Sequence, residues 1–183
     1  MQEAGTEPER PHDAPELLRR LLALIDSLHQ PQDLAVERVT QFIRLPMERF
    51  ADDSPKSRAL FAYSKLTPEW AYLLLWNVVD VTQLPSYGLQ FHPIRNNAPR
   101  PPMTGICQFD LAQFHDELLR MGYRHVSSTR QSTPARQYRR GPVEVDIGIV
   151  GESGESLEKI GHDCIRRISI DFLERFIGPG AER

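Results

Sequence analysis

The sequence predicts an α+β fold, in which N-terminal helices precede a mostly antiparallel sheet within a single domain. Helical patterns come first along the chain, and from Ser86 onward most segments alternate apolar with polar side chains, as strands do. One amphipathic helix, at residues 110–121, interrupts this strand-rich part, and we expect the sheet to pack on it. The chain of 183 residues, 40% hydrophobic and 26% charged, is long enough for one domain with its own core.

The domain should extend over residues 13–178, with flexible tails at 1–12 and 179–183. The first twelve residues are polar and contain two prolines, which favours an irregular tail. The first helix should then begin at Asp13, because Asp13 can cap it, Pro15 fits its first turn and Glu16 completes a capping box. Leucine and isoleucine recur at helical spacing as far as Leu28, so one broad face should be buried.

The middle of the chain is harder to assign from its pattern. Residues 34–50 fit a short helix or a strand, and both remain open. Residues 67–80 are apolar on all sides, so periodicity does not separate a buried helix from a buried strand. The start Thr67-Pro68-Glu69 favours a helix there, since it offers a hydroxyl cap and a proline in the first turn.

The later elements follow from alternation and capping. We expect a strand at SYGLQFH, a proline-rich loop, and a second strand at MTGICQF that pairs with the first. The helix at 110–121 should have Asp110 as its cap, Gln113 in a capping box and Gly122 as its stop. Further strands are predicted at RHVSST, ARQYRRG, VEVDIGIV and CIRRISIDF. A flexible acidic loop, GESGESLEKIGHD, should separate the last two, and FLERFIG is compatible with a further helical turn.

Composition excludes several classes of protein. The net charge of −3 gives no general attraction to nucleic acid or to an anionic membrane, and the longest apolar stretch is about half of what a bilayer-spanning helix needs. The two cysteines, Cys107 and Cys164, form neither a disulfide framework nor a metal-binding spacing. We therefore expect a reducing, cytoplasmic location.

The charge of the chain changes sign sharply within its last third. From Leu118 to Val143 there is no acid, and residues 144–163 carry six acids against one lysine. The basic stretch contains the arginines Arg120, Arg124, Arg130, Arg136, Arg139 and Arg140. Glu144 and Asp146 share one face of a predicted strand. Our hypothesis is that this face is exposed to solvent, and that arginines from adjacent strands pair with the two carboxylates.

Motifs of common enzymes are incomplete in this chain. Glu144 and Asp146 lack the following lysine of restriction-type nucleases, and GIVGESGES matches neither a nucleophile elbow nor a dinucleotide or phosphate loop. His162 lies two residues before Cys164, a spacing that a cysteine nucleophile could use, but a small core cysteine is the commoner case. The six histidines show no metal-binding spacing, so a metal site could arise only through tertiary convergence. We predict no catalytic residue, no cofactor and no metal ion, and therefore no enzyme.

In general form, the chain resembles the immunity proteins that bacteria encode beside toxins. The resemblance rests on the capped helix FHDELLRMGY, followed by the strands QYRRGPVEVDIGIV and CIRRISIDF. It implies a cytoplasmic inhibitor that binds one toxin domain directly and blocks its site. Two alternatives remain: a nucleic-acid-binding regulator that uses Arg120 to Arg140, and a small hydrolase that uses Glu144 with Asp146, or Cys164.

The expected partner is a protein, and binding to nucleic acid or to a membrane is not expected; the oligomeric state is not predicted. A protein partner would contact charged side chains of the loops and of the arginine face. The candidates are Arg95, Arg100, Arg136, Arg139, Arg140, Glu144, Asp146, Glu152 and Glu155. The acids would suit a basic toxin and the arginines an acidic one, and the sequence does not choose between them.

Overall fold

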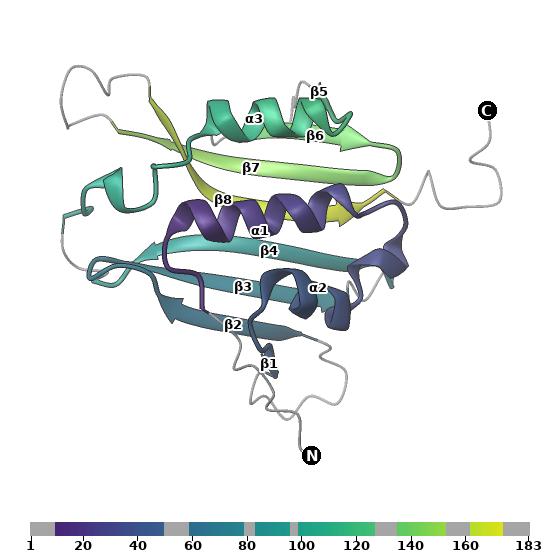
Figure 1. The fold of residues 1–183 in the computed structure, drawn as a ribbon, viewed down its shortest axis with the longest axis horizontal. Helices are drawn as coiled ribbons and strands as arrows, with labels where there is room; N and C mark the ends of the chain where they lie inside the picture. Colours follow the sequence, from purple (N-terminus) through teal and green to yellow (C-terminus); the bar gives the residue numbers. More distant parts are fainter. Residues whose placement is uncertain are drawn as a thin grey trace, which may run out of the picture.

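The architecture is an antiparallel sheet with helices on one face, which confirms the predicted α+β class (Figure 1). The computed structural model describes residues 10–49, 59–78, 83–95, 99–126, 135–152 and 162–173. The helices in these ranges are α1 (Ala14–Asp26), α2 (Val36–Ile43) and α3 (Leu111–Arg120), with short 3-10 helices η1 (Pro31–Leu34) and η2 (Met103–Gly105). Figure 1 shows α1, α2 and α3 in front of the sheet, with α1 over its central strands.

The sheet of the described residues has eight strands in the order β1-β2-β3-β4-β8-β7-β6-β5. They are β1 (Glu48–Arg49), β2 (Leu60–Lys65), β3 (Trp70–Val78), β4 (Pro85–Pro93), β5 (Arg124–Val126), β6 (Ala135–Arg140), β7 (Val143–Gly151) and β8 (Asp163–Phe172). This order divides the fold into two halves, each with helix first and then four sequential antiparallel strands. The last strand of each half, β4 and β8, pair at the centre of the sheet.

Helix α1 begins where its capping signals place it. The Asp13 carboxylate accepts a hydrogen bond from the Glu16 backbone N–H at 2.7 Å, and Pro15 lies in the first turn. Its leucine face is fully buried in the core between helices and sheet. Residues 34–50, which the sequence left open, contain α2, and its end at Arg44 has the left-handed backbone (φ 59°) that closes a helix.

The predicted helix at 67–80 is wrong, because this segment forms a turn and strand β3. The Thr67 hydroxyl does act as an acceptor, for the backbone N–H groups of Glu69 (3.2 Å) and Trp70 (3.0 Å). It closes the turn between β2 and β3 instead of starting a helix. β3 pairs with β2 on one side and β4 on the other, and apolar residues occupy both of its faces: Trp70, Tyr72 and Leu74 are buried toward the helices, and the partly buried Leu73 and Leu75 face away.

The strand predicted at MTGICQF, residues 103–109, is also wrong. The backbone N–H groups of Ile106 and Cys107 both bond to the Met103 carbonyl at 2.9 Å, which makes η2 a tight turn. The turn packs on Trp70, whose Nε1 donates to the Pro102 carbonyl at 2.9 Å, and a Cβ at Gly105 would approach the Trp70 ring to 3.0 Å. The strand neighbours of β4 are β3 and β8.

Helix α3 confirms the clearest prediction of the sequence. Asp110 and Gln113 form the reciprocal capping box, with distances of 2.9 and 3.0 Å, and the rings of Phe109 and Phe114 lie edge to face, 6.2 Å apart. Gly122 ends the helix with φ +85°. The strands predicted after it are present as β5 to β8. Outside the described residues lie residues 1–9 of the tail predicted at 1–12, the predicted tail at 179–183, residues 153–161 of the predicted acidic loop, and the turn predicted after Leu173.

The sheet has two different faces. In β7, Val143, Val145 and Ile147 are buried toward the helices, whereas Glu144 and Asp146 point to the opposite side. In the described ranges no helix covers that side, and we call it the helix-free face. Through the strand register it carries Tyr63, Leu73, Leu75, Gln90, Gln137, Arg139, Glu144, Asp146, Arg167, Ser169 and Asp171.

Candidate functional site

Three separate segments bring sulfur, imidazole and carboxylate groups together at one end of the second half. We call this group the Cys–His cluster, and its members are Cys107, Asp110, Glu152, His162 and Cys164. Cys107 and Asp110 precede α3, Glu152 follows β7, and His162 and Cys164 stand at the start of β8. The Glu152 backbone N–H donates to the His162 carbonyl at 3.2 Å, so the β7–β8 pairing holds these two side chains side by side.

Cys107 and Cys164 form a disulfide, which corrects the expectation of two unpaired cysteines. Their Cα atoms lie 5.0 Å apart, and the residues are 6% and 0% exposed. A separation of 57 residues gives no spacing signal, and only the packing of the η2–α3 segment against β8 brings them together. Since disulfides persist mainly in oxidising compartments, the cysteine argument for a cytoplasmic location no longer holds.

His162 lies between two carboxylates. Its Nδ1 is 2.7 Å from Glu152 Oε2, and its Nε2 is 2.7 Å from Asp110 Oδ2. The hydrogen bonds to Glu152 and then to Asp110 raise the pKa of His162 above its ordinary value, because both favour the imidazolium form. Glu152 itself is only 1% exposed, and this candidate contact residue is therefore part of the interior of the cluster.

The cluster has the composition of a metal site, although the sequence predicted none. The ligand atoms of Cys107, Glu152, His162 and Cys164 all lie within 4.8 Å of one another. Thiolate, imidazole nitrogen and carboxylate oxygen are the donors that bind Zn²⁺ in proteins. This is the tertiary convergence that spacing along the chain could not reveal.

A polar hollow of about 350 Å³ adjoins the cluster. It is lined by Asp110, Leu111, Ala112, His115, His125, Arg136, Tyr138, His162 and Asp163. His115 of α3 is half-buried here, with Nδ1 2.8 Å from the Tyr138 hydroxyl. The hollow leaves one edge of His162 accessible to small solutes.

On the helix-free face, three carboxylates gather on the adjacent strands β7 and β8. Glu144 stands directly opposite Asp171, and Asp146 opposite Ser169. Burial and then the Glu144 and Asp171 carboxylates raise the pKa of Asp146, and burial and then Glu144 raise the pKa of Asp171. Hydrogen bonds from Gln137 to Asp146 and from Ser86 to Asp171 only partly offset this. The like charges make this group locally unfavourable.

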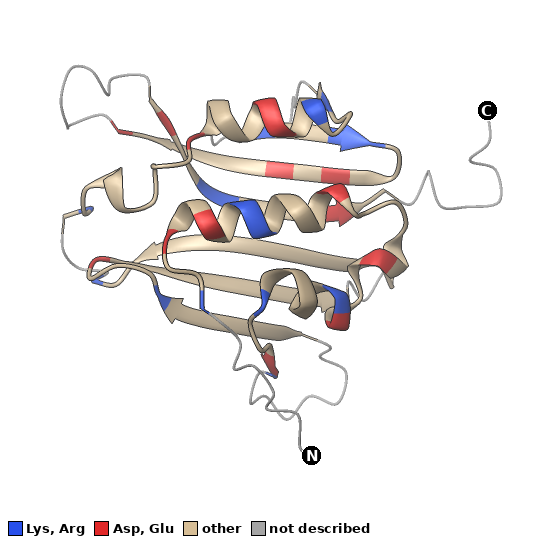
Figure 2. Cartoon of the chain, in the orientation of Figure 1, with Lys and Arg blue, Asp and Glu red and all other residues tan. Residues whose placement is uncertain are grey.

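The predicted pairing of arginines with the carboxylates of β7 is confirmed for Arg139. It stands opposite Glu144 on the neighbouring strand, and its Nε forms an ion pair with the Glu144 carboxylate. Figure 2 shows the two acidic positions of β7 as red bands beside the blue end of β6. Arg136 and Arg140 alternate with Arg139 along β6 and therefore point to the helix side of the sheet, so the hypothesis does not hold for them.

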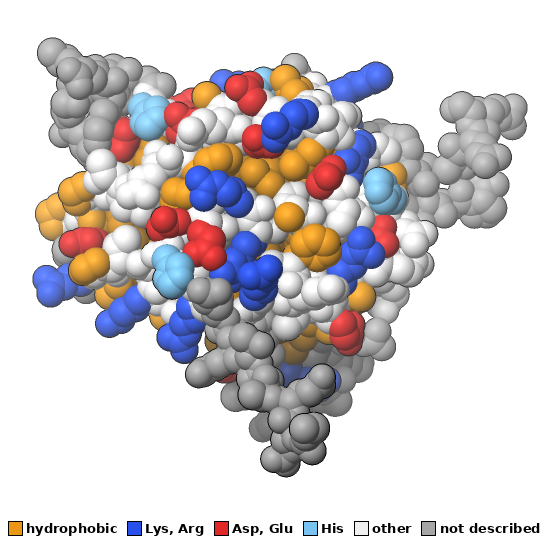
Figure 3. Space-filling model, in the orientation of Figure 1, with side chains coloured by type: hydrophobic (Ala, Val, Ile, Leu, Met, Phe, Trp, Pro, Cys, Tyr) orange, Lys and Arg blue, Asp and Glu red, His pale blue; other side chains and the backbone are white. Residues whose placement is uncertain are grey.

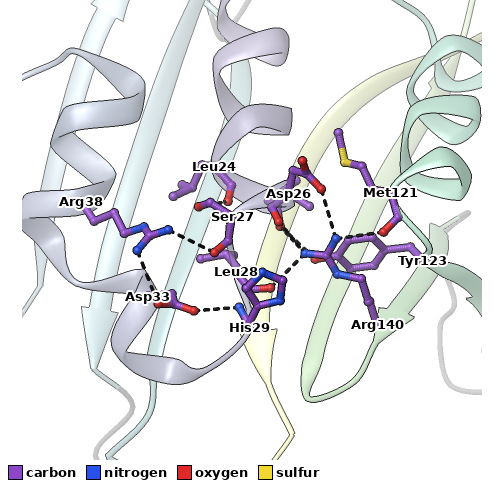
Figure 4. Close-up of polar contacts among 11 residues, drawn as sticks. Leu24, Asp26, Ser27, Leu28, His29, Asp33, Arg38, Met121, Tyr123 and Arg140 are labelled. Carbon is purple, nitrogen blue, oxygen red and sulfur yellow. Dashed lines mark hydrogen bonds and ion pairs between the residues drawn. The ribbon is translucent and has the colours of Figure 1, made fainter.

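Arg140 reaches the end of α1 (Figure 4). Its guanidinium donates to the carbonyls of Ile25 (3.2 Å), Asp26 (2.7 Å), Leu28 (2.9 Å) and Met121 (2.9 Å) and to the Asp26 carboxylate (3.2 Å). It also lies 4.6 Å from the centre of the Tyr123 ring. With its donors engaged in this way, Arg140 joins α1 to the second half of the fold.

The other candidate contact residues are dispersed. Arg95 borders a hollow of about 320 Å³ lined mainly by prolines, and Arg136 is exposed beside the polar hollow. Arg100 donates to the Gly151 carbonyl at 3.2 Å, next to Glu152. Glu155 lies outside the described residues. On the helix side, shown in Figure 3, basic and acidic side chains are interspersed and form no large patch of one sign.

Comparison of the chain with models of protein families, with curated proteins and with solved structures finds no match. The class of the protein is therefore defined by its own fold: it is an α+β protein with helices on one face of an antiparallel sheet. None of the helices in the described ranges has the length and apolar character that spanning a bilayer requires.

Proposed function

We propose that the protein is an inhibitor of the immunity type, which binds a cognate toxin domain through the helix-free face of its sheet. The observation that supports this most is the group of like-charged carboxylates Glu144, Asp146 and Asp171 on that face. Arrangements that weaken a fold locally are typical of functional surfaces. A basic side chain from a partner would replace repulsion between these groups with attraction.

The surroundings of the carboxylates suit a protein partner. Across the sheet, β2 and β3 present Tyr63, which is 56% exposed, and the partly exposed Leu73 and Leu75. A tyrosine among leucines offers the apolar contact area that carries affinity in interfaces, while the carboxylates steer a basic partner and fix its register. The toxin surface that fits this face therefore carries a basic patch beside an apolar one.

The geometry gives less support to the two alternatives, a nucleic-acid-binding regulator and a small hydrolase. The arginines of the 120–140 stretch that are described lie on both faces, with Arg120 paired to Glu117, Arg139 to Glu144 and Arg140 to α1. They form no continuous basic track of the kind that follows a phosphate backbone. A hydrolase using Cys164 would need a free thiolate, whereas this sulfur is bonded to Cys107.

The test is partner capture by the full-length protein, after nuclease treatment, in the organism that encodes it. The double variant Asp146→Asn/Asp171→Asn keeps the shape of both side chains and removes their charge, and Asp116→Asn on the exposed side of α3 is the matched control. We expect one stoichiometric protein partner for the wild type and the control, and at least tenfold weaker binding for the double variant, more so at low salt.

The captured partner should be toxic when produced alone, and the wild-type protein should neutralise it. Equal capture and neutralisation by the double variant would show that the helix-free face is not the binding surface. If no protein is captured, and nucleic acid is recovered once the nuclease is omitted, the regulator alternative replaces the inhibitor.

A further inference from the structure

We propose that the reduced protein binds one Zn²⁺ ion through Cys107, Glu152, His162 and Cys164. This site uses none of the residues of the proposed binding face, so the zinc proposal and the inhibitor proposal can be tested independently. The four donors come from three segments that the fold fixes in place: the turn before α3, the end of β7 and the start of β8. Two sulfurs, one imidazole and one carboxylate form a four-ligand set that is typical of tetrahedral zinc.

The distances require little movement. Around tetrahedral zinc, neighbouring donor atoms are roughly 3.3–3.8 Å apart. Cys107 Sγ already lies 3.6 Å from His162 Nδ1, and Glu152 Oε2 lies 2.7 Å from the same nitrogen. Once the sulfur–sulfur bond is broken, the two sulfurs need to separate to about 3.8 Å, which side-chain rotation can supply because the Cα atoms are 5.0 Å apart.

Asp110 supplies the hydrogen-bond partner that zinc-binding histidines usually have on their other ring nitrogen. Its carboxylate lies 2.7 Å from His162 Nε2, the nitrogen that faces away from the other donors. With Nε2–H bonded to Asp110, Nδ1 faces the other donors and can coordinate the ion once its own proton has left. Asp110 also caps α3 through the Gln113 backbone N–H, so its position does not depend on the metal.

Charge and burial also favour a cation. Two thiolates and the Glu152 carboxylate would place three negative charges in a site where both cysteines and Glu152 are buried, which is prohibitive without a compensating ion. Zn²⁺ reduces this to a net charge of −1, and Arg100 stands nearby with its guanidinium on the Gly151 carbonyl. The polar hollow beside His162 gives the ion a path from solvent.

The disulfide and the metal site are two states of the same residues. A dithiol reductant donates two electrons and two protons; the Cys107–Cys164 bond breaks, two thiols form, and the reductant becomes a disulfide. As it binds, Zn²⁺ displaces to solvent the two thiol protons and, from the imidazolium form of His162, the Nδ1 proton. An oxidant of the disulfide class reverses the sequence and expels the ion, so the site would report the redox state of its surroundings.

The experiment is a titration of the full chain with Zn²⁺ against a chromogenic chelator, in the reduced and in the oxidised form, with Co²⁺ as a spectroscopic probe. We expect one ion per reduced chain, a sulfur-to-cobalt charge-transfer band, and no stoichiometric binding by the oxidised chain. A reduced chain that binds no Zn²⁺, or an oxidised chain that binds it equally well, would overturn the proposal.

Variants that keep both cysteines separate ligation from folding. Glu152→Gln and His162→Gln should abolish stoichiometric binding by the reduced chain while the oxidised chains remain folded. Asp110→Asn retains a good helix cap and should weaken Zn²⁺ binding by about 10–100-fold. His92→Gln on β4 is the matched control and should bind like the wild type. If Glu152→Gln and His162→Gln bind Zn²⁺ as tightly as this control, the ion is held elsewhere and the assignment is wrong.

Discussion

Single side chains on the helix-free face act on stability in opposite directions. Arg139 and Glu144 attract each other across neighbouring strands, whereas Glu144 and Asp171 face each other with the same charge. The pKa values of Asp146 and Asp171 are raised because both carboxyls are partly buried beside other carboxylates. The fold therefore disfavours the ionised forms of these two carboxyl groups relative to the unfolded chain.

The first prediction concerns the dependence of stability on pH. Because the folded-state pKa values of Asp146 and Asp171 lie above 3.8, the folded protein binds protons more readily than the unfolded chain. Their contribution to the free energy of unfolding should thus rise as the pH falls through those values toward 3.8. The double variant Asp146→Asn/Asp171→Asn should be more stable than the wild type at pH 7, by about 0.5–1 kcal/mol, and this difference should shrink on acidification.

Urea denaturation of both proteins across the pH range measures this difference. Asp116→Asn, which is exposed on α3, serves as the control and should track the wild type at every pH. A double variant less stable than the wild type at pH 7 would mean that the two aspartates are stabilising, contrary to their environment.

Residue roles were predictable where they depend on local spacing. The caps Asp13 and Asp110 act on N–H groups three residues away, and Arg139 meets Glu144 across a tight hairpin, so a short window of sequence contains both partners. Arg140 looks the same as Arg139 in sequence. Its acceptors at the end of α1 are more than a hundred residues away, and only the assembled fold reveals its role.

At the scale of elements, α1 depends on β6 for its C-terminal end. The last turn of α1 has no basic residue of its own, and Arg140 from β6 donates to the carbonyls of Ile25, Asp26 and Leu28 instead. The same guanidinium stacks on Tyr123, whose pKa burial raises to about 12. Helix, strand and the chain leaving α3 therefore meet at one side chain.

The second prediction is that Arg140→Ala destabilises the protein by roughly 2–3 kcal/mol, because several partly buried carbonyls lose their donor. Arg140→Lys should recover only part of this loss, since an ammonium group cannot span the same acceptors. Arg120→Ala removes an arginine whose side chain is 72% exposed and should change stability by less than about 0.5 kcal/mol. Denaturant midpoints decide the order; equal midpoints for the alanine variants at 140 and 120 would contradict the capping role.

Helices and strands were predicted correctly where a sequence pattern is compatible with only one secondary structure. The alternation in VEVDIGIV and the capping box of α3 each indicate a single structure, and both are present. Thr67-Pro68-Glu69 was misread because a threonine hydroxyl followed by proline starts a turn as readily as a helix. MTGICQF alternates like a strand, but the fit of Gly105 against Trp70 decides for a turn, and that contact is tertiary.

At the scale of the whole molecule, the disulfide ties together only the second half. Cys107 precedes α3 and Cys164 lies in β8, so the closed loop contains α3 and β5 to β7. The first half, from α1 to β4, has no covalent link of this kind in its described residues. The Cys–His cluster could not be predicted from the sequence, because its members are brought together only by the pairing of β7 with β8 and by the packing of α3.

The third prediction follows from that loop. For a separation of 57 residues, the chain-entropy argument gives about 4 kcal/mol of stabilisation. Reduction should therefore lower the thermal midpoint markedly, and hydrogen exchange should speed up in α3 and β5 to β8 more than in α1 and β2 to β4. Cys107→Ser/Cys164→Ser should reproduce this in the absence of reductant and show no further change when reductant is added. Equal loss of protection in both halves would show that they unfold as one unit.

The central pairing of β4 with β8 also bears on how the chain assembles. Within each half, neighbouring strands are also neighbours in sequence, so their hairpins can form quickly. The four residue pairs between β4 and β8, from Tyr87 with Ile170 to Gln90 with Arg167, join segments that are far apart along the chain. Bringing these distant segments together lowers the entropy of the chain before any stabilising contact between them has formed. The rate-limiting event in folding should therefore be the docking of two largely preformed meanders along this seam.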